Sequence, residues 1–142
     1  GMYGIGAEGQ HKLKSVTRFK TYVSQIRQVK ARQTIGYNRK GQLNYDADIA
    51  VVPVGYADGL NRKLGNGKWG MIINGHKANI VGNICMDMCM LDVTGLKVSE
   101  GDEVEIFGSH LPVEKLAQAL DTIPSEIFTS ISRRVKRVYY YE

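Results

Sequence analysis

The sequence predicts a mainly β protein, a closed Greek-key-like β-barrel with one small helical insert near its C-terminus. Short strand-like runs follow one another through most of the 142 residues, and 16 glycines supply the turns between them. One of these turns, Asn74-Gly75, is a strong hairpin signal, and helices are predicted only in the last third of the chain. Many short strands with a single helical stretch are typical of barrels and sandwiches, and the length suits one domain.

The first half of the chain contains two strand predictions. Residues 13–29 fit a helical stripe and a strand equally well, and their density of Val, Thr, Phe and Tyr favours the strand. Residues 49–54, Ile-Ala-Val-Val-Pro-Val, form a continuous apolar run of the length expected of a buried strand. This strand ends in a loop, Gly-Tyr-Ala-Asp-Gly, at residues 55–59.

A β-hairpin is predicted in the middle of the chain. Asn74-Gly75 separates two apolar runs, residues 70–73 and 76–81. The tightest hairpin turns require positive φ at both central residues, which Asn and Gly adopt more readily than other residues. We therefore expect the two runs to pair as antiparallel strands.

The rest of the chain completes the barrel and adds the helices. Strands are predicted over residues 84–93 and 103–107. Apolar residues at helical spacing then predict a helix over residues 113–120, and a second short helix over residues 124–131. Residues 135–141 are predicted to form a final strand.

The composition is typical of a globular protein and argues against a disordered or membrane-spanning one. Hydrophobic residues make up 43% and charged residues 23%, as in globular proteins, and no apolar run is long enough to span a membrane. Cys85 and Cys89 would lie about 13 Å apart along an extended strand, too far for a disulfide. We therefore expect a reduced, cytoplasmic protein that does not enter a membrane.

The formal net charge of +5 permits binding to nucleic acid without establishing it. A basic β-barrel that stacks bases on Tyr139, Tyr140 and Tyr141 is one such possibility. Three consecutive tyrosines cannot share one face of a strand, however, and acidic residues between positions 100 and 105 interrupt a basic stripe. We therefore expect no nucleic-acid partner.

Two short motifs could carry chemistry. Tyr56 lies where a buried strand breaks into the 55–59 loop, and a phenol held there can act as a general acid or base. Asp87, in Cys-Met-Asp, would share a strand face with two cysteines and a leucine, so we expect it to be partly buried. A metal site is not expected, because the cysteines lack a matching second pair and the three histidines are scattered: His11, His76 and His110.

These motifs resemble the C-terminal domain of alanine racemases. The order and spacing agree from residue 54 to residue 94, and weaker similarity extends to residues 2–4, 13–30 and 131–137. The resemblance implies that residues 1–12 are the tail of a preceding barrel domain or a linker and that residues 13–142 form the C-terminal β domain. The segments that carry it are Val-Gly-Tyr-Ala-Asp-Gly at 54–59, Ile-Asn-Gly at 73–75, Ile-Val-Gly-Asn-Ile-Cys-Met-Asp at 80–87 and Asp-Val-Thr at 92–94.

The resemblance also implies a chemistry. Family members join a (β/α)8 barrel that binds pyridoxal phosphate to this β domain, act as head-to-tail homodimers, and interconvert L- and D-alanine for cell-wall synthesis. The family pattern makes Tyr56 the acid or base for one face of the substrate Cα, and Met86 the residue whose backbone N–H binds the substrate carboxylate. Asp58 and Asp87 would support them. The cofactor lysine and most of the cofactor site belong to the barrel, so this chain alone is expected to be inactive.

Two departures from the family pattern bear on the site. Arg133 stands where many members have a tyrosine that binds the cofactor phosphate, and a guanidinium can also hold phosphate. Asn83 stands where members often have arginine. Two related functions stay open: a racemase for another amino acid such as serine, and a pyridoxal-phosphate decarboxylase, in which Cys85 would be the important residue.

Overall fold

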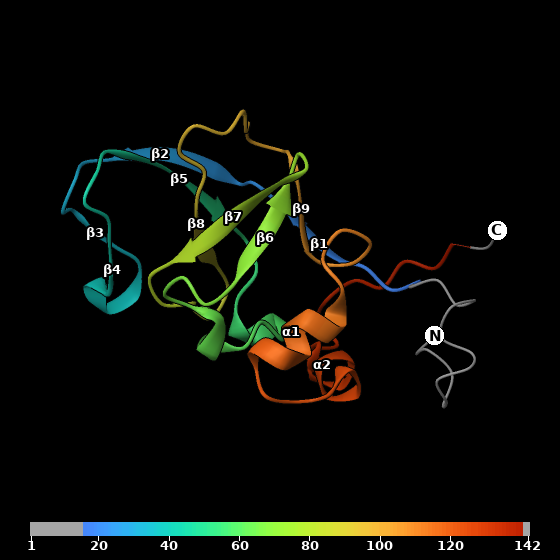
Figure 1. Ribbon diagram of the computed structural model, residues 1–142. Helices are drawn as coiled ribbons and strands as arrows, with labels where there is room; N and C mark the ends of the chain where they lie inside the picture. The colour runs from blue at the N-terminus through green and yellow to red at the C-terminus, as the bar shows by residue number, and fades with distance from the viewer. Residues whose placement is uncertain (1–15, 141–142) are drawn as a thin grey trace.

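The computed structural model describes residues 16–140, so the expected segment 1–12, the first residues of the predicted strand and Tyr141 lie outside the described residues. Its centre is a curled seven-stranded antiparallel sheet, a half-barrel, in the order β1-β9-β6-β7-β8-β5-β2 (Figure 1). The predicted mainly β class is confirmed. The strands of this sheet are β1 (Phe19–Tyr22), β2 (Gln25–Val29), β5 (Ala47–Val52), β6 (Gly70–Ile73), β7 (His76–Val81), β8 (Cys89–Asp92) and β9 (Glu103–Phe107).

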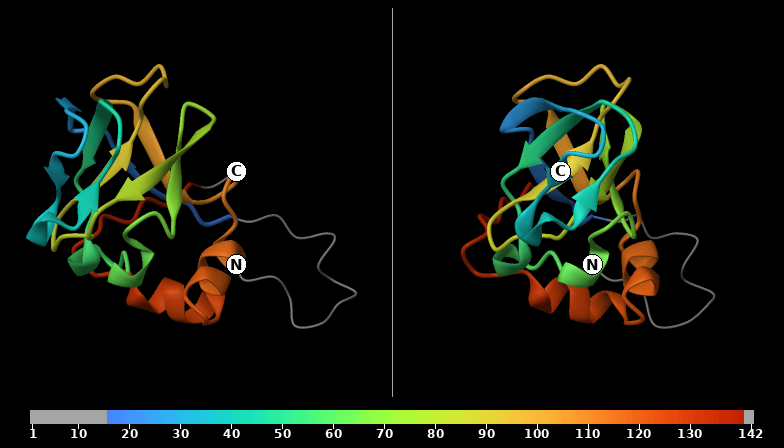
Figure 2. Two further views of the ribbon diagram at one scale, coloured as in Figure 1. Left: turned by 60° about the vertical axis from the view of Figure 1, so that its left-hand side comes forward. Right: turned by 90° about the vertical axis from the view of Figure 1, so that its left-hand side faces the viewer.

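The two edges of the sheet are joined by one bent stretch of chain. β1 pairs with β9 at one edge and β2 pairs with β5 at the other, and only Val23 and Ser24 separate them. The Val23 N–H donates to the carbonyl of Asp102 (2.9 Å), whereas the Ser24 N–H donates to the carbonyl of Val51 (2.9 Å). Consecutive residues therefore bond to opposite edges, which forces the sheet to curl (Figure 2). The strand predicted here is confirmed as two strands, β1 and β2.

A small second sheet, not predicted from the sequence, projects beside the main one (Figure 1). It consists of β3 (Thr34–Ile35) and β4 (Gly41–Gln42), which pair antiparallel. Each strand has two residues, too few to produce an alternating pattern that sequence reasoning could detect. The loop between them carries Tyr37.

The predicted hairpin is confirmed. Asn74 and Gly75 adopt φ angles of 49° and 80°, and Ile73 pairs with His76 across the turn. The Asn74 side chain also donates to the Asp102 carboxylate (2.7 Å), which ties the turn to the residue before β9.

Two predicted strands are corrected. The strand predicted over residues 84–93 is wrong in its first half, because β8 begins at Cys89. The preceding residues form a turn in which the Cys85 N–H donates to the carbonyl of Met88 (2.9 Å). The final strand predicted over residues 135–141 is also wrong for the described residues 135–140, where the Arg137 guanidinium donates to carbonyls of the preceding turn.

Two short helices, α1 (Val113–Ala119) and α2 (Pro124–Ser130), lie together at one end of the curled sheet (Figure 1). Phe107 of β9 connects them to the core, because its ring packs between Phe19 (centroids 5.7 Å apart) and Phe128 of α2 (5.9 Å). Within residues 16–140, neither helix is long and apolar enough to cross a membrane. The helices close the end of the half-barrel nearest the candidate site.

Candidate functional site

The candidate site is built around the loop between β7 and β8, residues 82–88, called here the 82–88 loop. Segments that contact this loop include the 55–59 loop after β5, the β3–β4 loop, residues 65–66 and the segment after α2. The fold thus brings together the two motifs that sequence reasoning selected, although thirty residues separate Tyr56 from Met86 in the chain.

Backbone hydrogen bonds interlock the 55–59 loop with the 82–88 loop. The Tyr56 N–H donates to the carbonyl of Cys85, and the Ala57 N–H donates to the carbonyl of Met86, both at 3.0 Å. These carbonyls are therefore used by a loop and not by a neighbouring strand. A Cβ at Gly55 would lie 2.2 Å from the Met86 oxygen, so only glycine allows this approach.

Tyr56 presents its side chain at the surface next to a cation. The residue is 42% exposed, and the Arg62 guanidinium lies 5.9 Å from the centre of its ring. Both residues line a hollow of about 560 Å³ whose opposite wall comes from the α1–α2 connection and α2. A phenol held in this position can donate a proton to a molecule bound against the loop, or accept a proton from it.

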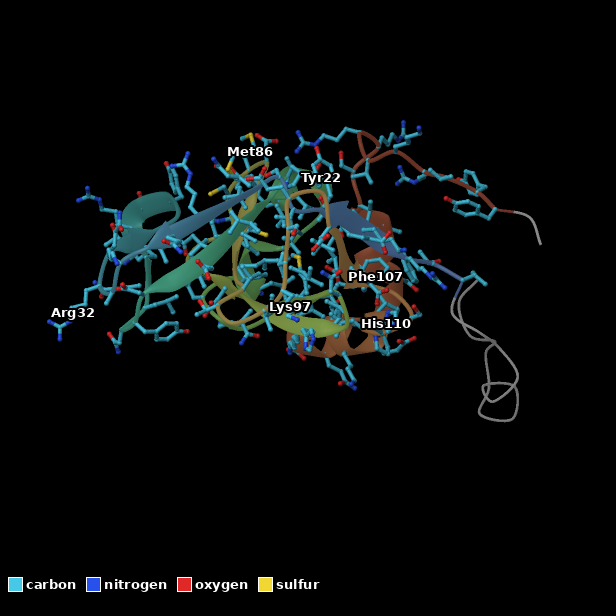
Figure 3. The ribbon with its side chains drawn as sticks, turned by 90° about the horizontal axis from the view of Figure 1, so that it is seen from above. Tyr22, Arg32, Met86, Lys97, Phe107 and His110 are labelled. Atoms are coloured by element: carbon cyan, nitrogen blue, oxygen red, sulfur yellow. The ribbon has the colours of Figure 1, made fainter. Side chains whose placement is uncertain are left out.

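Met86 offers an unused backbone donor. Its carbonyl accepts from Ala57, but its N–H donates to no acceptor among residues 16–140. Its side chain is 53% exposed and lies at the margin of the molecule, on the side along which the C-terminal segment runs (Figure 3). A free N–H in such a turn suits a carboxylate oxygen.

Asp87 is more exposed than predicted. The sequence placed it inside a strand and partly buried, whereas it lies in the turn before β8 with 55% of its side chain exposed. Its predicted need for a partner is met, because its Oδ1 accepts from the Arg134 Nη2 at 2.6 Å.

Arg134 is a site residue that sequence reasoning missed. Its Nε donates to Asp58 Oδ1 (2.7 Å) while its Nη2 donates to Asp87, so one guanidinium bridges both motif aspartates. The other Asp58 oxygen accepts from the Gly55 N–H (2.9 Å). These hydrogen bonds and the two carboxylate charges raise the pKa of Arg134, which stays cationic. The one available signal was that each aspartate needed a cation.

Tyr37 is a second residue that the sequence did not single out. It is 64% exposed, and positive φ angles on both sides, at Gly36 (77°) and Asn38 (57°), hold it in an unusual turn. The Asn83 side chain donates to the Tyr37 carbonyl (3.3 Å), which anchors this turn to the 82–88 loop. Unusual backbone geometry of this kind is concentrated at functional sites.

The remaining candidates lie nearby without joining the network. The Arg133 side chain is exposed and has no hydrogen-bond or ion-pair partner among the described residues, so its guanidinium is available to an anion. Cys85 and Cys89 are free thiols, and burial raises the pKa of the Cys89 thiol. No group of three His, Cys, Asp or Glu side chains in residues 16–140 could hold a metal ion.

One known protein family matches nearly the whole chain. Residues 16–139 match the family described as "Alanine racemase, C-terminal domain". The chain is similar to alanine racemase 1 of Caldanaerobacter subterraneus subsp. tengcongensis, with 43% identity over 140 residues. It is also similar to an alanine racemase of Desulfosudis oleivorans, with 46% identity over 132 residues. These matches cover 95% and 89% of this chain but only 36% and 34% of the relatives.

A solved structure shows the same fold. The crystal structure of alanine racemase from Bartonella henselae with covalently bound pyridoxal phosphate superposes with a TM-score of 0.88 and 38% sequence identity. The similarity covers 97% of this chain and 39% of that one. The chain therefore corresponds to a little over a third of the proteins that it resembles.

Proposed function

Because the chain belongs to the family of alanine racemase C-terminal domains, we propose that it supplies one part of the active site of a pyridoxal-phosphate-dependent alanine racemase used in cell-wall synthesis. The observation that carries this proposal is the interlocking of the 55–59 and 82–88 loops, which places an exposed tyrosine and a free backbone N–H on adjoining loops. The polypeptide would also contain a (β/α)8 barrel, and two subunits would form a head-to-tail homodimer. In that dimer, Tyr56 and Met86 would serve the active site in the partner subunit's barrel.

The residues present fit the expected cofactor at one point. Arg133 has an exposed guanidinium without a hydrogen-bond or ion-pair partner among residues 16–140, which suits the phosphate group of pyridoxal phosphate. When bound, the cofactor supplies an electron-withdrawing ring that accommodates negative charge at the substrate Cα. The barrel would hold the remainder of the cofactor.

Racemisation requires a proton to leave one face of Cα and another to arrive on the opposite face. We assign the first face to the hydroxyl of Tyr56, next to the Arg62 cation, and the second to a lysine of the barrel. The Met86 N–H would hold the substrate carboxylate, which fixes the orientation of Cα between the two groups.

Tyr37 is a second candidate for the same role. It is more exposed than Tyr56, it lies between two residues with positive φ, Gly36 and Asn38, and Asn83 anchors it to the same loop that carries Met86. The structure thus gives each tyrosine its own supporting observation.

The test uses Tyr56→Phe and Tyr37→Phe in the full-length protein, and each variant serves as the control for the other. Exchange of the Cα hydrogen with solvent deuterium is measured separately for L- and D-alanine. The variant that lacks the acid–base hydroxyl should slow exchange of one enantiomer by about 100-fold or more and the other much less. The other variant should slow both by a similar, smaller factor.

The pattern of losses decides the assignment. If the unequal loss appears in Tyr37→Phe, Tyr56 is a lining residue. If neither variant discriminates between enantiomers, the tyrosine acid–base role is wrong. Serine in place of alanine tests the substrate alternative in the same assay.

The decarboxylase alternative receives no support from the Cys85 environment. Its Sγ lies 3.9 Å from the carbonyl of Asn83, within its own loop, and the residue is only partly exposed. The family to which the chain belongs is described as the C-terminal domain of alanine racemase. We therefore do not propose a decarboxylase.

A further inference from the structure

The segment after α2 is attached to both motif loops by a small number of specific contacts. Arg134 bridges Asp58 and Asp87, and the Ser132 N–H donates to the carbonyl of Asp58 (3.2 Å). Gly59 lies so close that a Cβ there would be 2.8 Å from the Ile131 Cα. Three stretches that are distant in sequence therefore meet at one guanidinium.

The position of Arg134 argues against a role in general stability. Its side chain is 47% exposed and that of Asp87 is 55% exposed. Ion pairs this accessible to water contribute little to the free energy of folding. Asp58 is less accessible to water than Asp87, because its side chain is 14% exposed and its two oxygens accept hydrogen bonds from Arg134 and from the Gly55 N–H. The argument from exposure therefore applies to the Arg134–Asp87 pair.

The arrangement depends on the shape of the arginine side chain. Two nitrogens of one planar group, Nε and Nη2, reach two different carboxylates at 2.7 and 2.6 Å. A lysine ammonium has its donors on one atom and cannot reproduce a rigid two-point bridge. The bridge therefore fixes the distance between the loop of Tyr56 and the turn of Met86, in addition to neutralising the charges of Asp58 and Asp87.

We infer that Arg134 is a positioning residue: by bridging Asp58 and Asp87, it holds the 55–59 loop and the 82–88 loop in the relation that substrate binding requires. Arg134 itself touches neither substrate nor cofactor in this account. The inference rests on the proposed function, because it assigns to Arg134 the placement of Tyr56 and of the Met86 N–H. The same bridge anchors the segment that carries Arg133.

Hydrogen exchange in the full-length protein tests the bridge without requiring activity. In Arg134→Gln, the amides of Tyr56 and Ala57, which bond across the two loops, should exchange about tenfold faster or more. Lys136→Gln is the matched control, since it removes one positive charge from the same exposed segment and should leave both amides unchanged. Equal exchange in Arg134→Gln and the native protein would overturn the inference.

Kinetics then separate positioning from structure. Arg134→Gln and Asp87→Asn should each lower kcat/KM for alanine by about tenfold or more, through kcat as well as KM, because both Tyr56 and the Met86 N–H are displaced. Asp87→Asn, which removes only the exposed half of the bridge, should leave the unfolding midpoint nearly unchanged. The double variant should lose less than the product of the two single losses, because both act through one contact. Arg134→Lys should restore little of the loss.

Independent losses in the double variant, or full activity in Arg134→Lys, would contradict the inference. A lack of racemase activity in the native full-length protein would instead contradict the proposed function, and the exchange experiment would still decide whether Arg134 fixes the two loops.

Discussion

Gly55 allows the two motif loops of the site to approach each other. A side chain at this position would collide with the carbonyl oxygens of Met86 (2.2 Å) and Cys85 (2.4 Å), which are backbone atoms and cannot rotate away. The φ angle of Gly55 is −140°, an angle that any residue adopts, so the requirement is for space and not for backbone freedom.

Gly55→Ala should therefore separate the two loops. We expect it to lower the free energy of unfolding by about 1–3 kcal/mol, the usual cost of forcing extra volume into a packed site. In the full-length protein it should also lower kcat/KM for alanine. Urea denaturation measures the first effect, and an unchanged midpoint would show that the loops do not meet as described.

Individual site residues were predictable only where a local motif marked them. Tyr56, Met86, Asp58 and Asp87 belong to short runs whose spacing is visible in the sequence. Arg134 lies 76 residues from Asp58 and 47 from Asp87, and no pattern in the chain links such distant positions. The exposure of Asp87 was mispredicted because residues 84–88, which form a turn, continue the alternating side-chain pattern of β8 and so resemble part of that strand.

The hairpin of β6 and β7 was predictable from its turn residues alone, Asn74 and Gly75. Apart from its chain neighbours, no atom of residues 16–140 lies within 4 Å of a Cβ added at Gly75, so the constraint on a substitution there is its φ of 80°. Gly75→Val should destabilise the protein by about 1 kcal/mol or more because a β-branched residue is strained at this angle.

Gly75→Asn is the matched control, since asparagine tolerates positive φ and should cost less. Both variants are compared by their urea midpoints. Equal midpoints for Gly75→Val, Gly75→Asn and the native protein would count against strain at this turn.

Strands that depend on distant partners were less predictable than this hairpin. Residues 84–88 have the composition of a strand, but the carbonyls of Cys85 and Met86 bond to the 55–59 loop. Residues 135–140 are rich in Val and Tyr, yet Arg137 donates to the carbonyls of Ile131, Ser132 and Val135 and stabilises a turn at the start of this stretch. Strand propensity indicates which residues suit a sheet, whereas pairing requires a free neighbouring edge.

Glu105 in β9 stabilises the connection to α1. It is 5% exposed, and its Oε1 accepts hydrogen bonds from the His110 N–H (2.8 Å) and the Leu111 N–H (3.0 Å). Burial alone would raise the pKa of the Glu105 carboxyl, but these bonds, together with the His110 ring, outweigh burial and hold the pKa below its ordinary value.

The lowered pKa predicts an acid-sensitive contribution to stability. The contribution is complete above the unfolded-state pKa, about 4.3, and is lost as the pH falls through the lower folded-state value. Glu105→Gln should lower the free energy of unfolding by about 1–3 kcal/mol at pH 7, and the difference from the native protein should shrink below about pH 4.

Glu103→Gln, at an exposed position on the same strand, is the control and should change stability far less. Denaturation at a series of pH values provides the measurement. A difference between Glu105→Gln and the native protein that stayed constant down to about pH 2 would show that the Glu105 contribution does not depend on ionisation.

The whole domain leaves its site open on one side. Four large side chains in or beside the site loops remain partly exposed although the core of the half-barrel is well buried: Tyr37 (64%), Met86 (53%), Met88 (45%) and Tyr56 (42%). Apolar and aromatic surface gathered around a site is typical of an interface that another surface covers. The chain spans about a third of the relatives that it matches. The exposure agrees with the proposal that it contributes only part of a racemase site.

The central claim is that this chain contributes to a racemase site that it cannot complete alone. The most direct test incubates the purified chain and the full-length protein separately with pyridoxal phosphate and L-alanine and measures D-alanine, after circular dichroism has shown that the isolated chain is folded and β-rich. The account predicts that the full-length protein forms D-alanine until both enantiomers are equal, while the chain alone forms none above background. Racemisation by the isolated chain, or none by the full-length protein, would contradict it.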